Sequence, residues 1–451
     1  MCAHIKKWKL IAAGLCGVLI FSPLAAFADD FHYVNILVGD RAADMGGAYT
    51  AISDNAAGSF YNPAGIAFGQ GSNLSASVNG FSRSTKKYQD AMTQENGVKV
   101  DWEQDSSILL PNFFGTTYDT RLGTFGFSYA VPDSVQRRQD QTFNNIQSSV
   151  AGSYIGEYRL NIDDVDNLYY FGPSYAYKLS ETFSLGSTVY VTYRDSTIIR
   201  NSFLTLNNSS NGAQTGFEWR NSYVTLTEWG VRPTLGAIWS PREKIALGLT
   251  LSKRFNFSTD RAVANTINRN VGADPNNPLL SLSSSSADRD FPLEVKLGLA
   301  YFASPALLLA ADLSFYSGSG DFRRDVQTIR FTDQTLSAAT PQSDEMATVV
   351  NFALGAEYYL NERYAVRGGL YSDFANTDQV KNDGLTANQP EHIDLYGATL
   401  SLTRYTRSTS TTLGVGYAYG NGDAQIVADS PKVQSVEVRN LQMFLSAAYN
   451  F

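Results

Sequence analysis

Beyond the first 28 residues, the candidate general bases of this sequence are two histidines, His32 and His392. Neither lies in a recognisable nucleophile motif, so the pattern of a hydrolase is missing. No cluster of histidine or cysteine has the spacing of a metal site. We therefore predict that the protein is not an enzyme and that it uses no cofactor and no metal.

Charged residues recur at alternating positions within otherwise apolar stretches, which places them on the face opposite the apolar side chains. Two interpretations remain open. In the first, these residues form an ion-paired network that fills a polar interior. In the second, Arg232, Lys296 or Arg367 binds the carboxylate of a ligand, which an arginine does through two parallel hydrogen bonds. The residues concerned are Glu228, Arg232, Glu294, Lys296, Asp312 and Arg367.

The first 28 residues have the three parts of a secretory signal peptide. A basic region with three lysines precedes an apolar stretch at 10–24, and Ala26-Phe27-Ala28 supplies small residues at the cleavage positions. We expect cleavage after Ala28 and define 1–28 as the signal peptide. A transmembrane helix is the alternative, but the apolar run is short and ends in a cleavage pattern.

Export and cleavage change the chemistry of the remaining chain. Both cysteines, Cys2 and Cys16, are removed, so we expect no disulfide and no thiol chemistry. Three lysines are also removed, which lowers the count of Lys and Arg from 35 to 32 against 43 acidic residues and gives a formal charge of −11. That charge argues against a nucleic-acid partner.

The aromatic content indicates a barrel that spans a membrane. The exported chain has no apolar run long enough to cross a bilayer as a helix, yet the sequence contains 26 Tyr and 26 Phe. In a membrane barrel, alternate residues face lipid and a polar lumen, and aromatic rings gird both interfaces. A bacterial outer membrane is the expected location, with outer-membrane lipid and lipopolysaccharide as neighbours.

The C-terminal end carries the clearest strand pattern. Leu441, Met443 and Leu445 alternate with more polar residues, and the chain ends on Phe451. A terminal aromatic residue resembles the signal by which outer-membrane barrels are recognised for assembly. We therefore expect the barrel-assembly machinery as a partner that binds Phe451.

Similar apolar stripes recur along the chain, at 125–131, 293–299, 307–315 and 413–419. Between them, short polar turns alternate with long polar loops. Six turns and seven loops join about fourteen strands, an even number within the bacterial range. We predict an all-β fold over residues 72–451, a transmembrane antiparallel β-barrel of about 14 strands.

Residues 29–71 precede the first expected strand and follow a different pattern. They are too apolar for a disordered segment. Gly46 and Gly47 interrupt short helical turns, and the turns end at Asn62-Pro63-Ala64, where Pro63 fixes φ. Because a barrel of this size is wide enough to hold a plug, we predict a small hatch inside the lumen. A loosely tethered periplasmic extension is the alternative.

One stretch of this segment resembles a known family. The sequence "GDRAADMGGAYTAISDNAAGSFYNPAGIA", residues 39–67, is similar to the N-terminal hatch of the FadL/TodX family of outer-membrane long-chain fatty-acid and hydrocarbon transporters. The stretch "LLPNFF" at 109–114, the strand count and the aromatic terminus fit the same family.

The resemblance implies a monomeric barrel, with both termini periplasmic, that passes long-chain fatty acids or other hydrophobic small molecules inward. It also implies that the ligand opens the hatch and that a kink in the third strand gives a lateral exit. We assign that kink to Gly123 and Gly126, for which a plain strand is the alternative. The competing functions are a nonspecific polar porin and a structural or secretion-associated barrel with a related hatch.

Overall fold

The structure is a computed structural model that describes residues 31–69, 71–148, 151–269, 279–285, 290–319, 327–330, 336–338, 346–381, 389–425 and 432–451. The predicted signal peptide, 1–28, lies outside these residues. Among the described residues, no helix is both long and apolar enough to cross a membrane.

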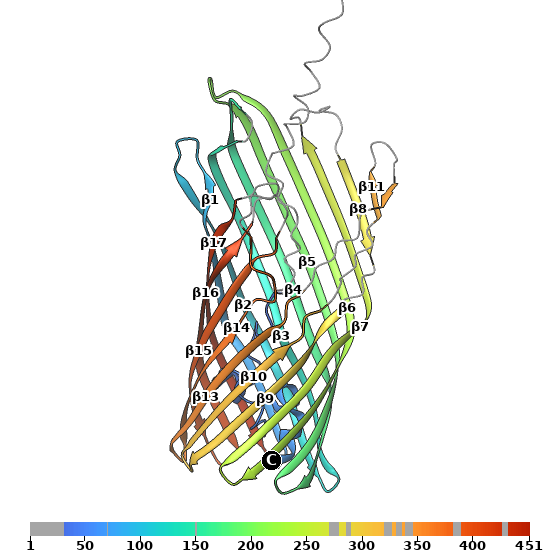
Figure 1. Ribbon diagram of the computed structural model, residues 1–451, viewed down its shortest axis with the longest axis vertical. Coiled ribbons are helices and arrows are strands. Elements are labelled where there is room, and N and C mark those ends of the chain that lie inside the picture. Colours follow the sequence, from blue (N-terminus) through green and yellow to red (C-terminus); the bar gives the residue numbers. More distant parts are fainter. Residues whose placement is uncertain are drawn as a thin grey trace, which may run out of the picture.

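The chain forms one closed antiparallel barrel (Figure 1). Each strand pairs with the next along the chain, and the last strand pairs with the first, with Leu74 opposite Tyr449. The barrel strands are β1 (Asn73–Thr93), β2 (Lys99–Thr120), β3 (Gly123–Gln147), β4 (Ser153–Ser180), β5 (Phe183–Asn208), β6 (Gln214–Arg242), β7 (Ile245–Arg269), β9 (Asp290–Ser304), β10 (Leu307–Tyr316), β13 (Val349–Asn361), β14 (Tyr364–Asp373), β15 (His392–Tyr405), β16 (Thr409–Ala424) and β17 (Gln434–Asn450).

Three further strands are short and do not interrupt this ring. They are β8 (Leu279–Ser285), β11 (Gln327–Arg330) and β12 (Leu336–Ala338), which pair with one another and with the far end of β7. Without them, the 17-stranded sheet reduces to a closed ring of fourteen strands. The predicted strand number and fold class are therefore confirmed.

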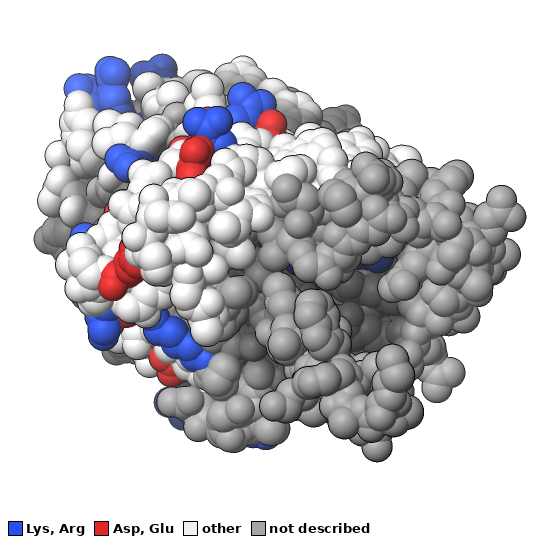
Figure 2. All heavy atoms as spheres, turned by 90° about the horizontal axis from the view of Figure 1, so that it is seen from above, with Lys and Arg blue, Asp and Glu red and all other residues white. Residues whose placement is uncertain are grey.

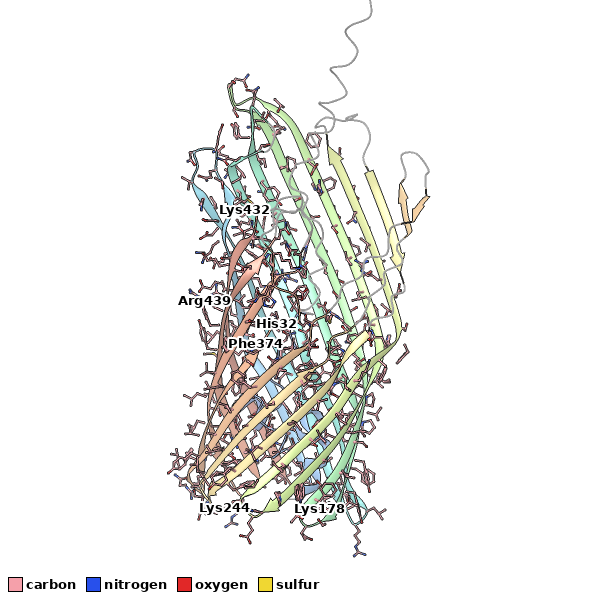
Figure 3. The ribbon with its side chains drawn as sticks, viewed as in Figure 1. His32, Lys178, Lys244, Phe374, Lys432 and Arg439 are labelled. Carbon is pink, nitrogen blue, oxygen red and sulfur yellow. The ribbon has the colours of Figure 1, made fainter. Side chains whose placement is uncertain are left out.

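Alternation along each strand separates the two faces of the wall. In β16, Leu413, Val415 and Tyr417 are exposed on the outer face, while the residues between them are buried inside. The strands differ in length, from 29 residues in β6 to 10 in β10, so one side of the barrel rises well above the other (Figure 1). The short turns lie at the opposite end, where Figure 3 places Lys178 and Lys244.

The N-terminal segment, described over residues 31–69, lies inside the lower part of the barrel (Figure 1). It contains helices α1 (Arg41–Asp44) and α2 (Gly58–Tyr61) and the 3₁₀ helix η1 (Pro63–Phe68). Its alanines are small enough to fit this confined volume, and most are fully buried. One hydrophobic cluster joins residues of this segment, among them Tyr49 and Tyr61, to wall residues such as Tyr170 and Tyr190.

Candidate functional site

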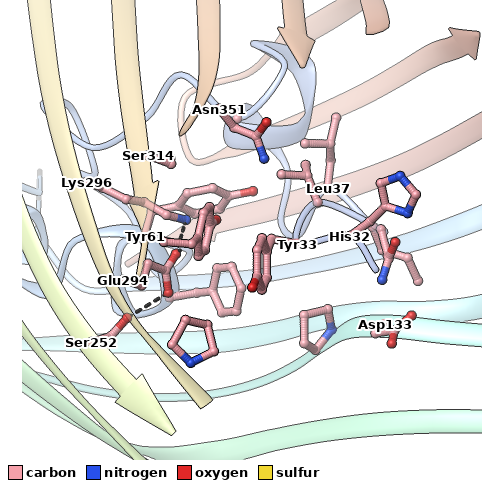
Figure 4. Close-up of a pocket in the computed structure, with 18 of the residues that line it drawn as sticks. His32, Tyr33, Leu37, Tyr61, Asp133, Ser252, Glu294, Lys296, Ser314 and Asn351 are labelled. Carbon is pink, nitrogen blue, oxygen red and sulfur yellow. Dashed lines mark hydrogen bonds and ion pairs between the residues drawn. The ribbon is translucent and has the colours of Figure 1, made fainter. Parts of the chain in front are cut away.

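A cavity of about 200 Å³ lies between the N-terminal segment and the barrel wall (Figure 4). We call it the lumen cavity. Aromatic rings line it from both sides, since Tyr33, Phe60 and Tyr61 come from the segment and Tyr170 and Tyr316 from the wall. Charged side chains share this lining. The cavity can therefore contact both an apolar chain and an ionic head group of one ligand. The charged residues are Asp133, Arg194, Arg232, Lys253, Arg254, Glu294, Lys296 and Asp312.

Two of the predicted ligand partners, Arg232 and Lys296, meet in this cavity around Glu294. Arg232 Nη2 lies 2.5 Å from Glu294 Oε2, and Lys296 Nζ lies 2.8 Å from Glu294 Oε1. Ser252 Oγ donates to Oε2 at 2.7 Å, and Tyr316 Oη donates to Oε1 at 3.3 Å. Register explains the meeting, because Ser252 and Tyr316 are the direct cross-strand neighbours of Glu294 on β7 and β10.

The same two cations also contact the N-terminal segment. The Arg232 guanidinium lies 5.6 Å from the ring centres of both Phe60 and Tyr170, and Lys296 Nζ lies 5.8 Å from the ring centre of Tyr61. These are cation–π distances. The charged cluster of the wall and helix α2 of the segment therefore form one continuous site.

A second chain of charges extends along the wall from β4 to β7. Arg194 binds Asp166 through two hydrogen bonds of 3.0 Å, and Glu228 lies 3.9 Å from Arg194 and 3.1 Å from Arg254. These side chains are almost completely buried. Because adjacent strands carry opposite charges, each buried ion has a counter-ion, as low-dielectric burial requires.

Arg367, the third predicted ligand partner, lies elsewhere and is not among the residues that line the lumen cavity. It binds Glu357 Oε1 and Asp44 Oδ2, both at 2.6 Å. Arg41 pairs with the same Glu357, 2.5 Å from its other oxygen, and with Asp54 at 2.9 Å. Arg367 therefore joins helix α1 to strands β13 and β14.

Burial raises the pKa of Asp44 from 3.8 to about 6, although the neighbouring Arg367 opposes the shift. Asp44 belongs to helix α1, outside the spanning strands. Its backbone oxygen also accepts a hydrogen bond from Thr399 of β15 at 2.7 Å.

The Asn62-Pro63-Ala64 motif is fixed to the wall. Asn62 Nδ2 donates to the carbonyl oxygens of Thr50 at 2.8 Å and Ala237 at 3.1 Å, while its Oδ1 accepts the Ala64 N–H at 3.1 Å. The last bond caps η1, which Pro63 begins. A Cβ on Gly236 would lie only 2.0 Å from Asn62 Oδ1, so the wall position facing this motif requires glycine.

Hydroxyl groups of the wall bind the backbone of the N-terminal segment at several further points. Ser184 donates to the Ala64 carbonyl at 2.9 Å, Thr188 to Ser59 at 2.8 Å and Thr250 to Tyr61 at 3.1 Å. Asp312 accepts the N–H groups of Tyr49 and Thr50 at 2.9 and 2.8 Å. Sequence reasoning missed the hydroxyls. The available signal was Ser or Thr at inward positions of the strands.

Gly46 and Gly47 lie where the segment turns after α1, with φ of +64° and +87°. Both border the lumen cavity. A Cβ on Gly46 would lie 3.1 Å from the backbone of Gly369 in β14, so the segment and the wall approach each other closely here.

Residues 31–37 separate the lumen cavity from a second cavity of about 140 Å³. The N–H groups of Tyr33 and Val34 donate to Asp373 at 3.1 and 3.2 Å, and His32 Nε2 lies 2.7 Å from the Ile393 oxygen. The Tyr33 ring stacks on Tyr316 with centres 4.0 Å apart. The other candidate base, His392, bonds through Nδ1 to the Thr377 oxygen at 2.8 Å.

Pairing between β2 and β3 is interrupted next to this stretch. Ser106 pairs with Arg137, and the next pair is Phe113 with Ala130. Backbone of the N-terminal segment lies in the interruption. The Ile36 N–H donates to the Pro132 oxygen at 3.2 Å, and Asn112 donates to the Leu37 oxygen at 2.9 Å.

The two glycines predicted to kink the wall lie in regularly paired parts of β3. Gly123 pairs with Thr120 at the turn and Gly126 pairs with Thr117. The interruption begins further along β3, beyond Ala130, where a proline occurs in each strand. These are Pro111 and Pro132, and neither can donate a backbone hydrogen bond.

Among the described residues, no group of three or more His, Cys, Asp or Glu has the arrangement of a metal site. The sequence matches the model of a family described as "Outer membrane protein transport protein (OMPP1/FadL/TodX)" over residues 26–448. A comparison with curated proteins found no match.

Three solved structures share this fold at low sequence identity. A FadL homologue of Pseudomonas aeruginosa superposes with a TM-score of 0.59 at 14% identity, covering 93% of this chain and 100% of its own. The Pseudomonas putida toluene transporter TodX gives 0.58 at 14% identity, with the same coverage. The monoaromatic hydrocarbon channel CymD gives 0.55 at 15% identity, covering 93% and 99%.

Proposed function

The chain belongs to the OMPP1/FadL/TodX family of outer membrane transport proteins, and we propose that its substrates are long-chain fatty acids. Membership makes it an outer-membrane β-barrel channel for hydrophobic compounds and not an enzyme. The observation that carries the choice of substrate is the lumen cavity, in which aromatic rings surround Arg232 and Lys296. The rings bind the hydrocarbon chain, and the cations bind its carboxylate.

Neutral aromatic hydrocarbons are the second candidate substrates. CymD is a monoaromatic hydrocarbon channel, and the rings of Tyr33, Phe60 and Tyr170 in this chain suit such a ligand. A neutral hydrocarbon, however, gains nothing from a charged cluster. It offers no partner to the polar groups of the protein that line the cavity. We therefore favour the fatty acid.

We propose that residues 29–71 act as a hatch and that 31–37 is the part that moves. The region around Asn62 is fixed by bonds from several strands, including those from Ser184, Thr188 and Thr250. Residues 31–37 instead separate two cavities, so their displacement joins the cavities into a longer path. A ligand that pushes between Tyr33 and Tyr316 would start this displacement.

The interruption between β2 and β3 supports a lateral exit into the membrane. Leu109, beside it, is 72% exposed on the outer face. Burying a methylene group is worth about 0.8 kcal/mol, so a chain of about fifteen carbons prefers a bilayer to water by roughly 12 kcal/mol. Release through the wall spares the ligand this transfer into the aqueous periplasm.

We further propose a monomer with both termini facing the periplasm. The C-terminal end lies with the short turns (Figure 1), and the barrel-assembly machinery would bind Phe451 there. At the other end, exposed ion pairs such as Arg83–Asp105 and Arg138–Asp163 suit contact with lipopolysaccharide. Figure 2 shows lysines, arginines and acidic residues on that end of the molecule.

Uptake by cells tests the substrate. In a strain that depends on this protein, the double variant Arg232→Gln, Lys296→Gln should take up radiolabelled hexadecanoate roughly tenfold more slowly than wild type, because two charge-assisted contacts are lost. Uptake of toluene should be unchanged. Equal hexadecanoate uptake by wild type and variant would contradict the proposal. Arg439→Gln, an exposed arginine that pairs with Glu437 outside the cavity, serves as the control.

A further inference from the structure

Glu294 has the bonding of a ligand in a binding site. Its two carboxylate oxygens accept from four donors, namely Arg232, Ser252, Lys296 and Tyr316. The four donors come from β6, β7, β9 and β10, and each of them lines the lumen cavity, as does Glu294 itself (Figure 4). The wall thus forms a receptor for one carboxylate, and a side chain of the wall occupies it.

Both cations of this receptor are bound to one carboxylate. Two cations, Arg232 and Lys296, face the single carboxylate of Glu294 within it. Asp312, which accepts backbone hydrogen bonds of the N-terminal segment, is a second carboxylate in the lining of the same cavity. A ligand carboxylate that entered the cavity would find a cation to bind, but it would have to share the donors with Glu294.

We propose that Glu294 is a built-in competitor of the ligand's carboxylate and sets how strongly the channel prefers acids over neutral molecules of the same length. This inference rests on the proposed function. Without ligand, Glu294 keeps both cations paired and the empty cavity stable. When an acid binds, its carboxylate takes hydrogen-bond donors from Glu294. The loss of the Glu294 contacts offsets part of the attraction between the acid and the two cations.

The position of Arg232 and Lys296 connects this exchange to the N-terminal segment. Arg232 lies over Phe60 and Lys296 over Tyr61, the last two residues of α2. A cation that turns toward a ligand's carboxylate leaves its place over the ring. Exchange of carboxylates at Glu294 therefore changes contacts that hold the segment in the barrel.

The variant Glu294→Gln tests the proposal because it keeps the shape and one acceptor oxygen but removes the competing charge. We would measure the Kd of the full-length protein in lipid nanodiscs at pH 8 for hexadecanoate and for the neutral hexadecanol. The Kd for hexadecanoate should fall about tenfold, the change expected for one charge-assisted hydrogen bond, while the Kd for hexadecanol stays the same.

The matched control is Glu218→Gln. Glu218 is also buried and paired with an arginine, Arg220, but it lies outside the lumen cavity, so both dissociation constants should stay at the wild-type values. An unchanged ratio of the two constants in Glu294→Gln, or weaker binding of hexadecanoate, would overturn the inference. Absence of binding of both ligands by wild type would instead contradict the proposed function.

Discussion

The side chain of Asn62 bonds to three parts of the molecule at once. It joins η1, the preceding turn at Thr50 and the wall strand β6, through Ala237. Asn62, Thr50 and Ala64 are fully buried and the bond to Ala237 is partly buried, so water does not readily replace these bonds when the side chain is shortened. Asn62 therefore stabilises the inserted state of the segment rather than a single helix end.

We predict that Asn62→Ala weakens insertion of the N-terminal segment by roughly 3 kcal/mol, about 1 kcal/mol for each of the three hydrogen bonds. Hydrogen exchange of the amides in 49–66 measures this directly and should become faster. The control is Asn96→Ala, since Asn96 makes its bond to Val98 in an exposed loop. Unchanged amide exchange in Asn62→Ala would contradict this prediction, because it would show that the wall hydroxyls alone hold the segment in place.

Asp44 gives the insertion a dependence on pH. Its pKa is raised to about 6 in the inserted state by burial, and it returns to about 3.8 when the segment leaves the wall. The inserted state therefore binds the proton more tightly. The contribution of protonated Asp44 to the stability of the inserted state is complete below pH 3.8 and is lost as the pH rises through 6. The facing groups are Arg367, Asp40 and Ser401.

We accordingly expect Asp44→Asn to remove a pH response. In wild type, exchange of the amides in α1 should be slower at pH 5 than at pH 7, after correction for the intrinsic rate. The difference between wild type and Asp44→Asn isolates this group from other carboxylates. An identical pH dependence in the two proteins would contradict the assignment.

At the residue scale, the sequence supported the inward orientation of the charged residues but not their partners. Alternation alone identifies Arg232 and Lys296 as facing the lumen. The pairing of Glu294 with both cations depends on the relative register of β6, β7, β9 and β10. No local sequence pattern encodes that register. For the same reason, the sequence could not tell that Arg367 binds Asp44 of the segment rather than lining the cavity.

At the scale of elements, the feature with most consequence is the interruption between β2 and β3. Unpaired backbone inside a membrane needs another partner. Here the Ile36 N–H of the N-terminal segment provides one for the Pro132 carbonyl, and the Asn112 side chain donates to the Leu37 carbonyl of the same segment. The interruption and the segment are therefore coupled, since moving the segment exposes the strand edges.

We predict that Asn112→Ala releases residues 31–37 without unfolding the barrel. Loss of the bond to Leu37 should speed exchange of the Ile36 amide about fivefold, which corresponds to about 1 kcal/mol. Amides of β16 and β17, on strands that Asn112 does not touch, serve as the internal control. A rate unchanged at Ile36 would mean that the bond to Leu37 does not hold this stretch.

The strand number was predictable because each strand carries its own alternation, and fourteen such patterns close one ring. The place of the interruption was predicted at Gly123 and Gly126, whereas the structure interrupts pairing beyond Ala130. Glycine only permits a bend, while proline removes a donor. The two prolines, Pro111 and Pro132, were visible in the sequence, but only the pairing of β2 with β3 shows that they lie near the same break.

At the scale of the whole molecule, the barrel is a wide tube whose lower part is filled by a segment of its own chain. A 14-stranded wall without this filling would enclose water. The competing interpretation, a nonspecific polar porin, requires that water path to be open. The buried cluster that joins Tyr49 and Tyr61 to the wall favours a closed state.

We predict that the wild-type protein gives little steady ion current in a planar bilayer and that deletion of residues 31–69 gives a large one. The wall should still close in the deletion, because its first pair joins Asn73 to Asn450 and needs no residue of the segment. Large currents in the wild type would support a porin.

A crystal structure with a hexadecanoate brominated at its far end tests most directly whether the lumen cavity binds a long-chain fatty acid by its carboxylate. We predict elongated density along Phe60 and Tyr170, with the carboxylate within about 3 Å of Arg232 or Lys296, a hydrogen-bond distance, and the bromine signal away from both. An empty lumen cavity at saturating ligand, or a bromine signal beside Glu294, would contradict binding of the carboxylate by Arg232 and Lys296.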